Sequence, residues 1–211
     1  IFFIFITKMV KNLGILVDSS GSMMDMEPKE TVQSLNKNIK KIADDETNIF
    51  VAKFSEDYNL FIKNKRKNEI IILENDIYPD GLTALYDGIF NICNDIDEIC
   101  QTESNNDTTI IILTDGDENS SQYTKITDIR TLIKTKKELG WNFIFLGANQ
   151  DAITTGNEMG INRNSCCTYN ATSGGLDSAL SCTSNAIERN YGYGAQEIEF
   201  SQDERNQSIN A

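Results

Sequence analysis

The sequence predicts an α/β fold in which helices flank a mostly parallel sheet. Two observations carry this prediction. Short apolar runs that break into polar, glycine-containing loops alternate with segments in which apolar residues recur every three or four positions. In addition, 211 residues, 39% of them hydrophobic, are enough for one domain with a full core and too few for two comfortable ones.

The N-terminal part of the chain contains a strand, a loop and a helix in succession. The apolar run from Leu13 to Val17 ends in a polar loop with a glycine, as a buried parallel strand does. An amphipathic helix entered near Pro28 follows, because apolar side chains recur at helical spacing. They are Val32, Leu35, Ile39 and Ile42.

A hairpin comes next. The strand-like runs Asn48 to Phe54 and Tyr58 to Ile62 are separated by three polar residues, so we expect the second run to be an antiparallel edge strand. The segment from Lys63 to Asp80 begins with a basic cluster and ends in a turn signal. We expect it to be a surface excursion, although it contains the letters "IIIL".

The second half continues the alternation. Its most regular helical stripe begins at Ala84, with Thr83 placed to cap the helix. Thr109 to Leu113 and Trp141 to Gly147 predict two more buried strands, and Ser165 to Asn170 is a candidate for a final short strand. Two further apolar stripes predict helices. They are Ile126, Ile129, Leu132 and Ile133, and Leu176, Leu180, Thr183 and Ile187.

The two ends of the chain are expected to lie outside the domain, which would span residues 10–190. Residues 1–9 form an N-terminal extension, and two interpretations of it stay open. Because Met9 stands just before the first clear strand, Ile1 to Lys8 are either translated upstream sequence or a short edge strand. Residues 191–211 are polar and aperiodic, so we expect a flexible tail.

Composition excludes several classes of function. The chain carries 32 acidic against 19 basic residues, a net charge of -13, which disfavours nucleic acid and anionic membranes as partners. It has no histidine, which removes histidine-based catalysis and histidine-rich zinc sites. The apolar run "IFFIFI" is far shorter than the roughly 20 residues of a membrane helix. Five irregularly spaced cysteines suggest free thiols and a cytoplasmic location.

Oxygen-bearing side chains gather where the predicted strands end. Asp18, Ser20 and Ser22 alternate after the first strand, so that an extended loop can turn their oxygens to one point. Thr83 offers a hydroxyl before a helix, and Asp115 follows a later strand. In a parallel sheet, ligands bind at the carboxyl ends of the strands. Carboxylates with hydroxyls suit Mg²⁺ or Mn²⁺ rather than zinc.

These motifs resemble those of a known family. D-x-S-x-S after the first strand, a threonine in G-x-T-x-L-Y-D, and T-D-G after a later strand look like the von Willebrand factor type A (VWA) domain and its metal-ion-dependent adhesion site (MIDAS). The likeness covers roughly Val10 to Asn190, and the stretch "GWNFIFLGANQDA" is similar to a bacterial and viral, intracellular subset. The resemblance implies a doubly wound, Rossmann-like sheet of six strands, in the order 3-2-1-4-5-6, with one antiparallel edge.

The resemblance also implies a function. Ser20, Ser22 and Thr83 would be hydroxyl ligands of a Mg²⁺ ion, while Asp18 and Asp115 would neutralise the ion directly or through water. One coordination position would stay open for an Asp or Glu carboxylate of a protein partner. This is recognition without bond breaking, so we expect a binding domain and no enzyme.

Two alternatives remain. One is a Mg²⁺-dependent phosphoryl-transfer enzyme, but a dehalogenase-type phosphatase needs a second aspartate where this chain has Ser20, and a toprim site needs a glutamate where it has Asp18. The other is a structural module in which the ion only ties loops together. Four nearby acids are interpreted as a helix-turn acid and solvated loop acids, outside the site: Asp87, and Asp25, Asp117 and Glu118.

Overall fold

The computed structural model describes residues 10–100, 106–148, 151–193 and 197–211. Its strands form one sheet in the order β3-β2-β1-β4-β5-β6, with every pairing parallel except that of β2 with β3. The predicted doubly wound sheet with an antiparallel edge is therefore confirmed. The strands are β1 (Val10–Asp18), β2 (Asn48–Phe54), β3 (Tyr58–Lys65), β4 (Asn106–Thr114), β5 (Asn142–Ala148) and β6 (Cys166–Tyr169).

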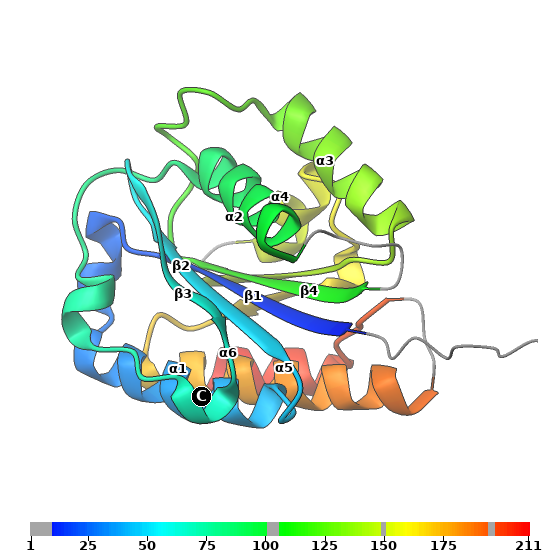
Figure 1. The fold of residues 1–211 in the computed structure, drawn as a ribbon. Coiled ribbons are helices and arrows are strands. Elements are labelled where there is room, and N and C mark those ends of the chain that lie inside the picture. Colours follow the sequence, from blue (N-terminus) through cyan, green and yellow to red (C-terminus); the bar gives the residue numbers. More distant parts are fainter. Residues whose placement is uncertain (1–9, 101–105, 149–150, 194–196) are drawn as a thin grey trace, which may run out of the picture.

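Helices cover both faces of the sheet (Figure 1). One layer holds α1 (Pro28–Ile42), α5 (Ser173–Tyr193) and α6 (Gln202–Asn210), and the other holds α2 (Leu85–Cys100), α3 (Ile126–Glu138) and α4 (Ala152–Glu158). Alternate residues of β1 serve the two faces: Ile15 and Val17 pack under α1, and Leu16 packs under α2. The short 3-10 helices are η1 (Gly21–Asp25), η2 (Lys67–Glu69), η3 (Glu74–Ile77) and η4 (Arg163–Ser165).

The segment from Lys63 to Asp80 is not the simple surface excursion that its ends predict. Ile70, Ile72 and Ile77 are buried in the core layer beneath α1, whereas Ile71 is 71% exposed. The Asn36 side chain of α1 holds the segment in place, donating to the Ile72 carbonyl and accepting from its N–H, both at 2.9 Å. The apolar run in this segment therefore indicated residues of the hydrophobic core.

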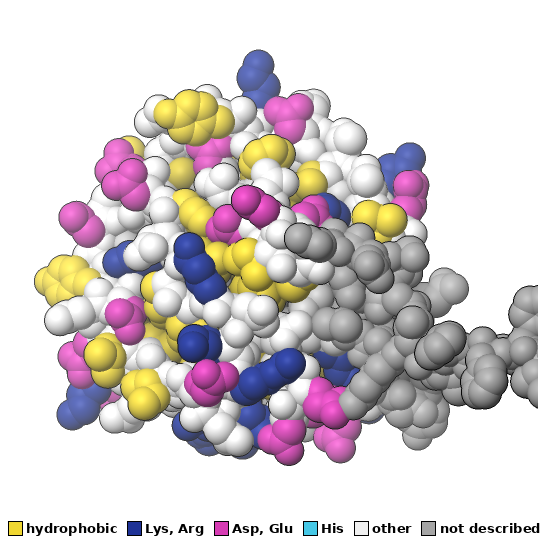
Figure 2. Space-filling view, in the orientation of Figure 1, with side chains coloured by type: hydrophobic (Ala, Val, Ile, Leu, Met, Phe, Trp, Pro, Cys, Tyr) yellow, Lys and Arg dark blue, Asp and Glu magenta, His cyan; other side chains and the backbone are white. Residues whose placement is uncertain are grey.

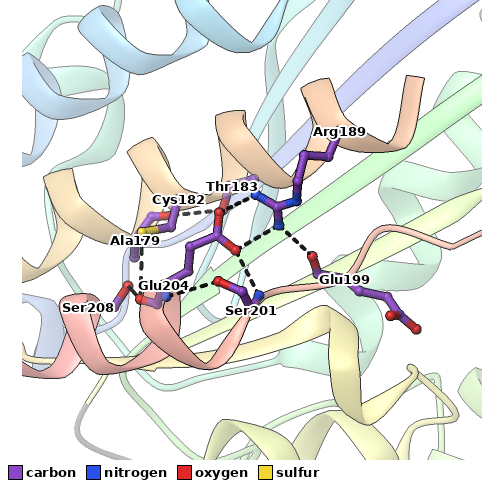
Figure 3. A network of polar contacts seen from close by, with 8 residues as sticks. All are labelled: Ala179, Cys182, Thr183, Arg189, Glu199, Ser201, Glu204 and Ser208. Carbon is purple, nitrogen blue, oxygen red and sulfur yellow. Dashed lines mark hydrogen bonds and ion pairs between the residues drawn. The ribbon is translucent and has the colours of Figure 1, made fainter. Parts of the chain in front are cut away.

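The expected flexible tail is wrong for the residues described after 196. Ile198 and Phe200 are buried, and α6 packs against α5 and β6. Figure 3 shows the polar contacts that hold it: Arg189 of α5 donates to both oxygens of Glu204, at 2.6 and 2.8 Å. Burial opposes ionisation of Glu204, but the hydrogen bonds from Arg189 and Ser201 outweigh it and lower the pKa of this carboxyl. The periodicity of α6 is weak, because the residues that it buries, Glu204 and Ser208, are polar.

Two smaller predictions, the final strand and the free cysteines, have clear outcomes. The candidate final strand is present as β6, and the short helix α4, which no apolar stripe announces, begins where Asp151 accepts from the Thr154 N–H. All five cysteines are unpaired, and burial raises the pKa of Cys93 to about 12. No helix in the described part of the chain combines the length and apolarity needed to cross a bilayer. Residues 1–9 lie outside the described residues.

Candidate metal centre

Three loops meet at the carboxyl ends of β1 and β4, as the fold predicts. We call them loop 1 (residues 19–27), loop 2 (residues 79–84) and loop 3 (residues 115–125). Loops 1 and 2 are joined by two backbone hydrogen bonds, from the Gly21 N–H to the Gly81 carbonyl at 2.9 Å and from the Asp80 N–H to the Ser19 carbonyl at 2.7 Å. The loops therefore form one connected rim.

Loop 3 is attached to loop 2 through Thr83 and Asn119. The Asn119 side chain accepts from the Thr83 N–H at 2.9 Å, and the Asn119 N–H donates to the Thr83 carbonyl at 3.0 Å. This reciprocal pair fixes the backbone of Thr83. Sequence reasoning missed Asn119, since an asparagine in a polar loop carries no signal of its partner.

Asp18 ends β1 and is the buried base of the site. One of its oxygens accepts from the Ser20 N–H at 2.7 Å, and the other accepts from the Thr114 hydroxyl at 2.6 Å. Thr114 is the last residue of β4 and is completely buried. It too escaped prediction, although its place directly before Asp115 puts it beside Asp18 in the parallel register.

A chain of hydrogen bonds links the predicted ligands of loops 1 and 3. The Ser20 and Ser22 hydroxyl oxygens are 3.1 Å apart, and the Ser22 hydroxyl donates to Asp115 at 2.6 Å. Alternate residues of the loop thus turn their oxygens to one point, as the D-x-S-x-S spacing predicts.

Thr83 belongs to the same group, and the evidence comes from Gly116. A Cβ added to Gly116 would lie 2.9 Å from the Thr83 hydroxyl oxygen and 3.5 Å from that of Ser22. Both hydroxyls therefore face the turn that carries Asp115. All five predicted residues converge.

The chain matches one known protein family over most of its length. Residues 12–180 match the model of the von Willebrand factor type A domain. The chain belongs to this family. Domains of this kind are typically adhesion or scaffold modules that bind other proteins. None of the curated proteins matches the sequence significantly.

Solved structures share the VWA fold at low identity. Proximal thread matrix protein 1 from the mussel byssus has a TM-score of 0.67 and 19% identity, over 85% of this chain and 48% of that protein. The vWF domain of the type V pili tip protein Mfa5 from Porphyromonas gingivalis has a TM-score of 0.63 and 11% identity, over 92% of this chain and 98% of that one. The chain thus spans about half of the mussel protein.

The predicted cap of α2 is replaced by loop 3 in this VWA domain. The Tyr86 N–H donates to Glu118 at 3.0 Å and to the Ser121 hydroxyl at 3.1 Å, so the Thr83 hydroxyl is not the acceptor for this N–H. Glu118 also accepts from the Ser121 N–H at 2.7 Å. It is a structural acid that joins loop 3 to α2, and the interpretation as a solvated acid is wrong. Asp87, as predicted, lies in the first turn of α2.

The electrostatics of the VWA site favour a cation. Burial raises the pKa of Asp18 to about 6, against hydrogen bonds from Thr114 and Ser20 that lower it. Burial likewise raises the pKa of Asp115, where the nearby charge of Asp25 adds to the effect. Within the described part of the chain, neither carboxylate has a lysine or arginine as an ion-pair partner.

The donor set fits a small divalent cation. Two carboxylates and three hydroxyls supply only oxygen, which Mg²⁺ and Mn²⁺ prefer. A cation would compensate the negative charges of the buried Asp18 and the partly exposed Asp115. Among the described residues, there is no group of three or more His, Cys, Asp and Glu side chains that could hold a metal. A metal site here therefore depends on the hydroxyls.

Proposed function

We propose that this VWA domain binds Mg²⁺ through Asp18, Ser20, Ser22, Thr83 and Asp115, and that a protein partner completes the site with an Asp or Glu carboxylate. One observation carries the proposal: two strand-end carboxylates, which have no basic partner among the described residues, face three hydroxyls from loops 1 and 2. Mn²⁺ has the same preference for oxygen ligands and is the alternative ion.

The residues around the proposed ion differ in how they are held and in how far they are buried. Asp18 is held by Thr114 and the Ser20 backbone, so its oxygens are oriented before any ligand arrives. Asp18, Ser20 and Thr83 are buried, whereas Ser22 is exposed and Asp115 is partly exposed. The ion would supply a positive charge that attracts a carboxylate, and the exposed side of the site is where a partner could reach it.

The rim of the site offers apolar contacts to the same partner. Met24 in loop 1 and Leu82 in loop 2 are 52% and 51% exposed. Met23 and Met26, the other methionines of loop 1, are buried core residues. These two exposed apolar side chains suit a partner that places apolar residues beside its carboxylate, because such contacts exclude water from the central one.

Thermal unfolding tests the metal site. At about 100 times the dissociation constant, an ion that binds only the folded state adds about 2.7 kcal/mol, which corresponds to a rise of roughly 5–10 °C in Tm for a domain of this size. We expect this rise with Mg²⁺ in the wild type and its loss in Asp115→Asn.

Asp117→Asn is the matched control. It removes one charge from the same loop, two residues away, at an exposed position. It should keep the Mg²⁺-dependent rise. A wild-type Tm that is the same in millimolar Mg²⁺ and in chelator would show that the site is not a working metal site, and the structural-module alternative would take its place.

The same measurement ranks the ions. A second structure of the mussel protein has a zinc-occupied MIDAS motif, so zinc belongs in the comparison with Mg²⁺ and Mn²⁺. A larger rise with Zn²⁺ than with Mg²⁺ at equal concentration would contradict the preference inferred from the oxygen donors.

Partner binding separates the remaining functions. A partner that uses an acidic residue should be lost on chelation and on substitution of that residue by its amide, and regained with added Mg²⁺. A partner that stays bound in chelator would favour the structural module. We propose that the protein is cytoplasmic, because its cysteines are free thiols. We also propose that it binds its partner without catalysis, because its sequence contains no histidine.

A further inference from the structure

We infer that the domain has a second ligand site, for a small organic phosphate, at the opposite end of the sheet from the metal centre. A pocket of about 410 Å³ lies there, within the size range of small-molecule sites. Its floor includes Leu13 near the start of β1, about 16 Å along the strand from Asp18. The two sites are therefore separate.

The walls of the pocket come from elements far apart in the sequence. The end of α1 supplies Lys40, Lys41 and Ile42, and the later part of α5 supplies Ser184 and Ile187. Apolar and polar surface are mixed, as in sites that hold an organic body together with a charged group.

The charge of the pocket opposes that of the protein. Four lysines and two acids line it, and Asp45, which pairs with Lys67, brings the local charge to +1 in a chain of net charge -13. In Figure 2, Lys and Arg side chains lie among Asp and Glu side chains in the half of the view where Figure 1 places α1 and α5. Among the described residues, neither Lys40 nor Lys41 forms an ion pair, so their charges are available to an anion.

A buried hydroxyl in the pocket independently indicates a ligand. Thr109 of β4 lines the pocket and is 2% exposed, and its side-chain oxygen has no hydrogen-bond partner among the described residues. A buried hydroxyl without a partner costs free energy, so such groups are rare in folded proteins. A phosphate oxygen of a ligand between Thr109 and the lysines would satisfy it.

Phosphate suits this arrangement better than a single carboxylate. Lysine ammonium groups bind phosphate as point charges, and the two positive charges of Lys40 and Lys41 match the charge of a phosphate group. The volume exceeds that of one phosphate, which leaves room for an organic body against Ile42 and Ile187.

Calorimetric titration of the full chain with ADP and with pyrophosphate tests the inference. Chelator is present throughout, so the metal centre takes no part, and Asp115→Asn should bind these probes like the wild type. We expect saturable binding that weakens with added salt. The double variant Lys40→Glu, Lys41→Glu should lose about tenfold or more in affinity.

Two further variants guard against a general charge effect and against misfolding. Lys29→Glu with Lys125→Glu makes the same change in net charge at exposed positions outside the pocket, and should change the affinity by less than about twofold. Thr109→Val keeps the shape and removes the hydroxyl, so Tm should be kept or raised while affinity falls. Absence of saturable binding of both probes, equal losses in the two lysine pairs, or unchanged affinity in Thr109→Val would each overturn the proposal.

Discussion

Phe200→Ala is expected to destabilise the domain by about 3–4 kcal/mol, a fall of roughly 6–16 °C in Tm. Phe200 is 6% exposed and belongs to the buried cluster that α1 and α5 share with the sheet. Its N–H also donates to the Asn164 carbonyl at 2.9 Å, which places the segment beside η4 and β6. Truncation would therefore leave a cavity in the core. Unfolding in urea, monitored by circular dichroism, measures the loss in the free energy of unfolding.

Ile209→Ala is the matched control, because it removes a comparable side chain from the same segment at a 45% exposed position. It should cost less than about 1 kcal/mol. Equal effects of the two substitutions would mean that the segment is not packed on the domain in solution.

The docked C-terminal segment shows a limit of periodicity. The stripes that predict α1 and α2 belong to helices that bury a whole face, whereas α6 contributes only Glu204 and Ser208 as buried residues. Its attachment relies on polar groups: Glu204 with Arg189, and the Ser165 hydroxyl, which donates to the Ile198 carbonyl at 2.6 Å. Such partners are distant in sequence, so a one-dimensional pattern does not reveal them.

The proposed ligand residues of the metal centre were easier to predict than the residues that hold them in place. Asp18, Ser20 and Ser22 are close in sequence, and strand order brings Asp115 beside them, so spacing and topology suffice. The residues that hold them, Thr114 and Asn119, act through single hydrogen bonds. Their residue types are common in loops and strand ends, and only the three-dimensional arrangement gives them a role.

Gly175→Ala is expected to be the second strongly destabilising change, at about 3 kcal/mol. A Cβ at this position would lie 2.3 Å from the carbonyl oxygen of Asn170 and 3.1 Å from its nitrogen. Both are backbone atoms, which cannot swing away as a side-chain end can. The turn is also tightly bonded, with the Thr172 N–H donating to the same carbonyl at 2.7 Å.

Gly174→Ala separates this steric effect from the general effect of replacing glycine in a helix. Its Cβ would meet nothing closer than 3.5 Å, so it should be neutral or stabilise α5 by up to about 1 kcal/mol. The two variants differ by one position, and their Tm values should change in opposite directions or by clearly different amounts. Similar values would mean that the turn at Asn170 adapts freely.

The Gly175 substitution should also loosen α6, because Asn170 joins the two features. The Asn170 N–H donates to the Ser208 carbonyl at 3.3 Å, and its side chain donates to the Ile209 carbonyl. A shift of Asn170 that relieves the clash would strain these bonds. The costs of Gly175→Ala and Phe200→Ala should therefore fail to add, because the first change already weakens the docking that the second removes. Full additivity in the double variant would show that the start of α5 and the C-terminal segment are energetically independent.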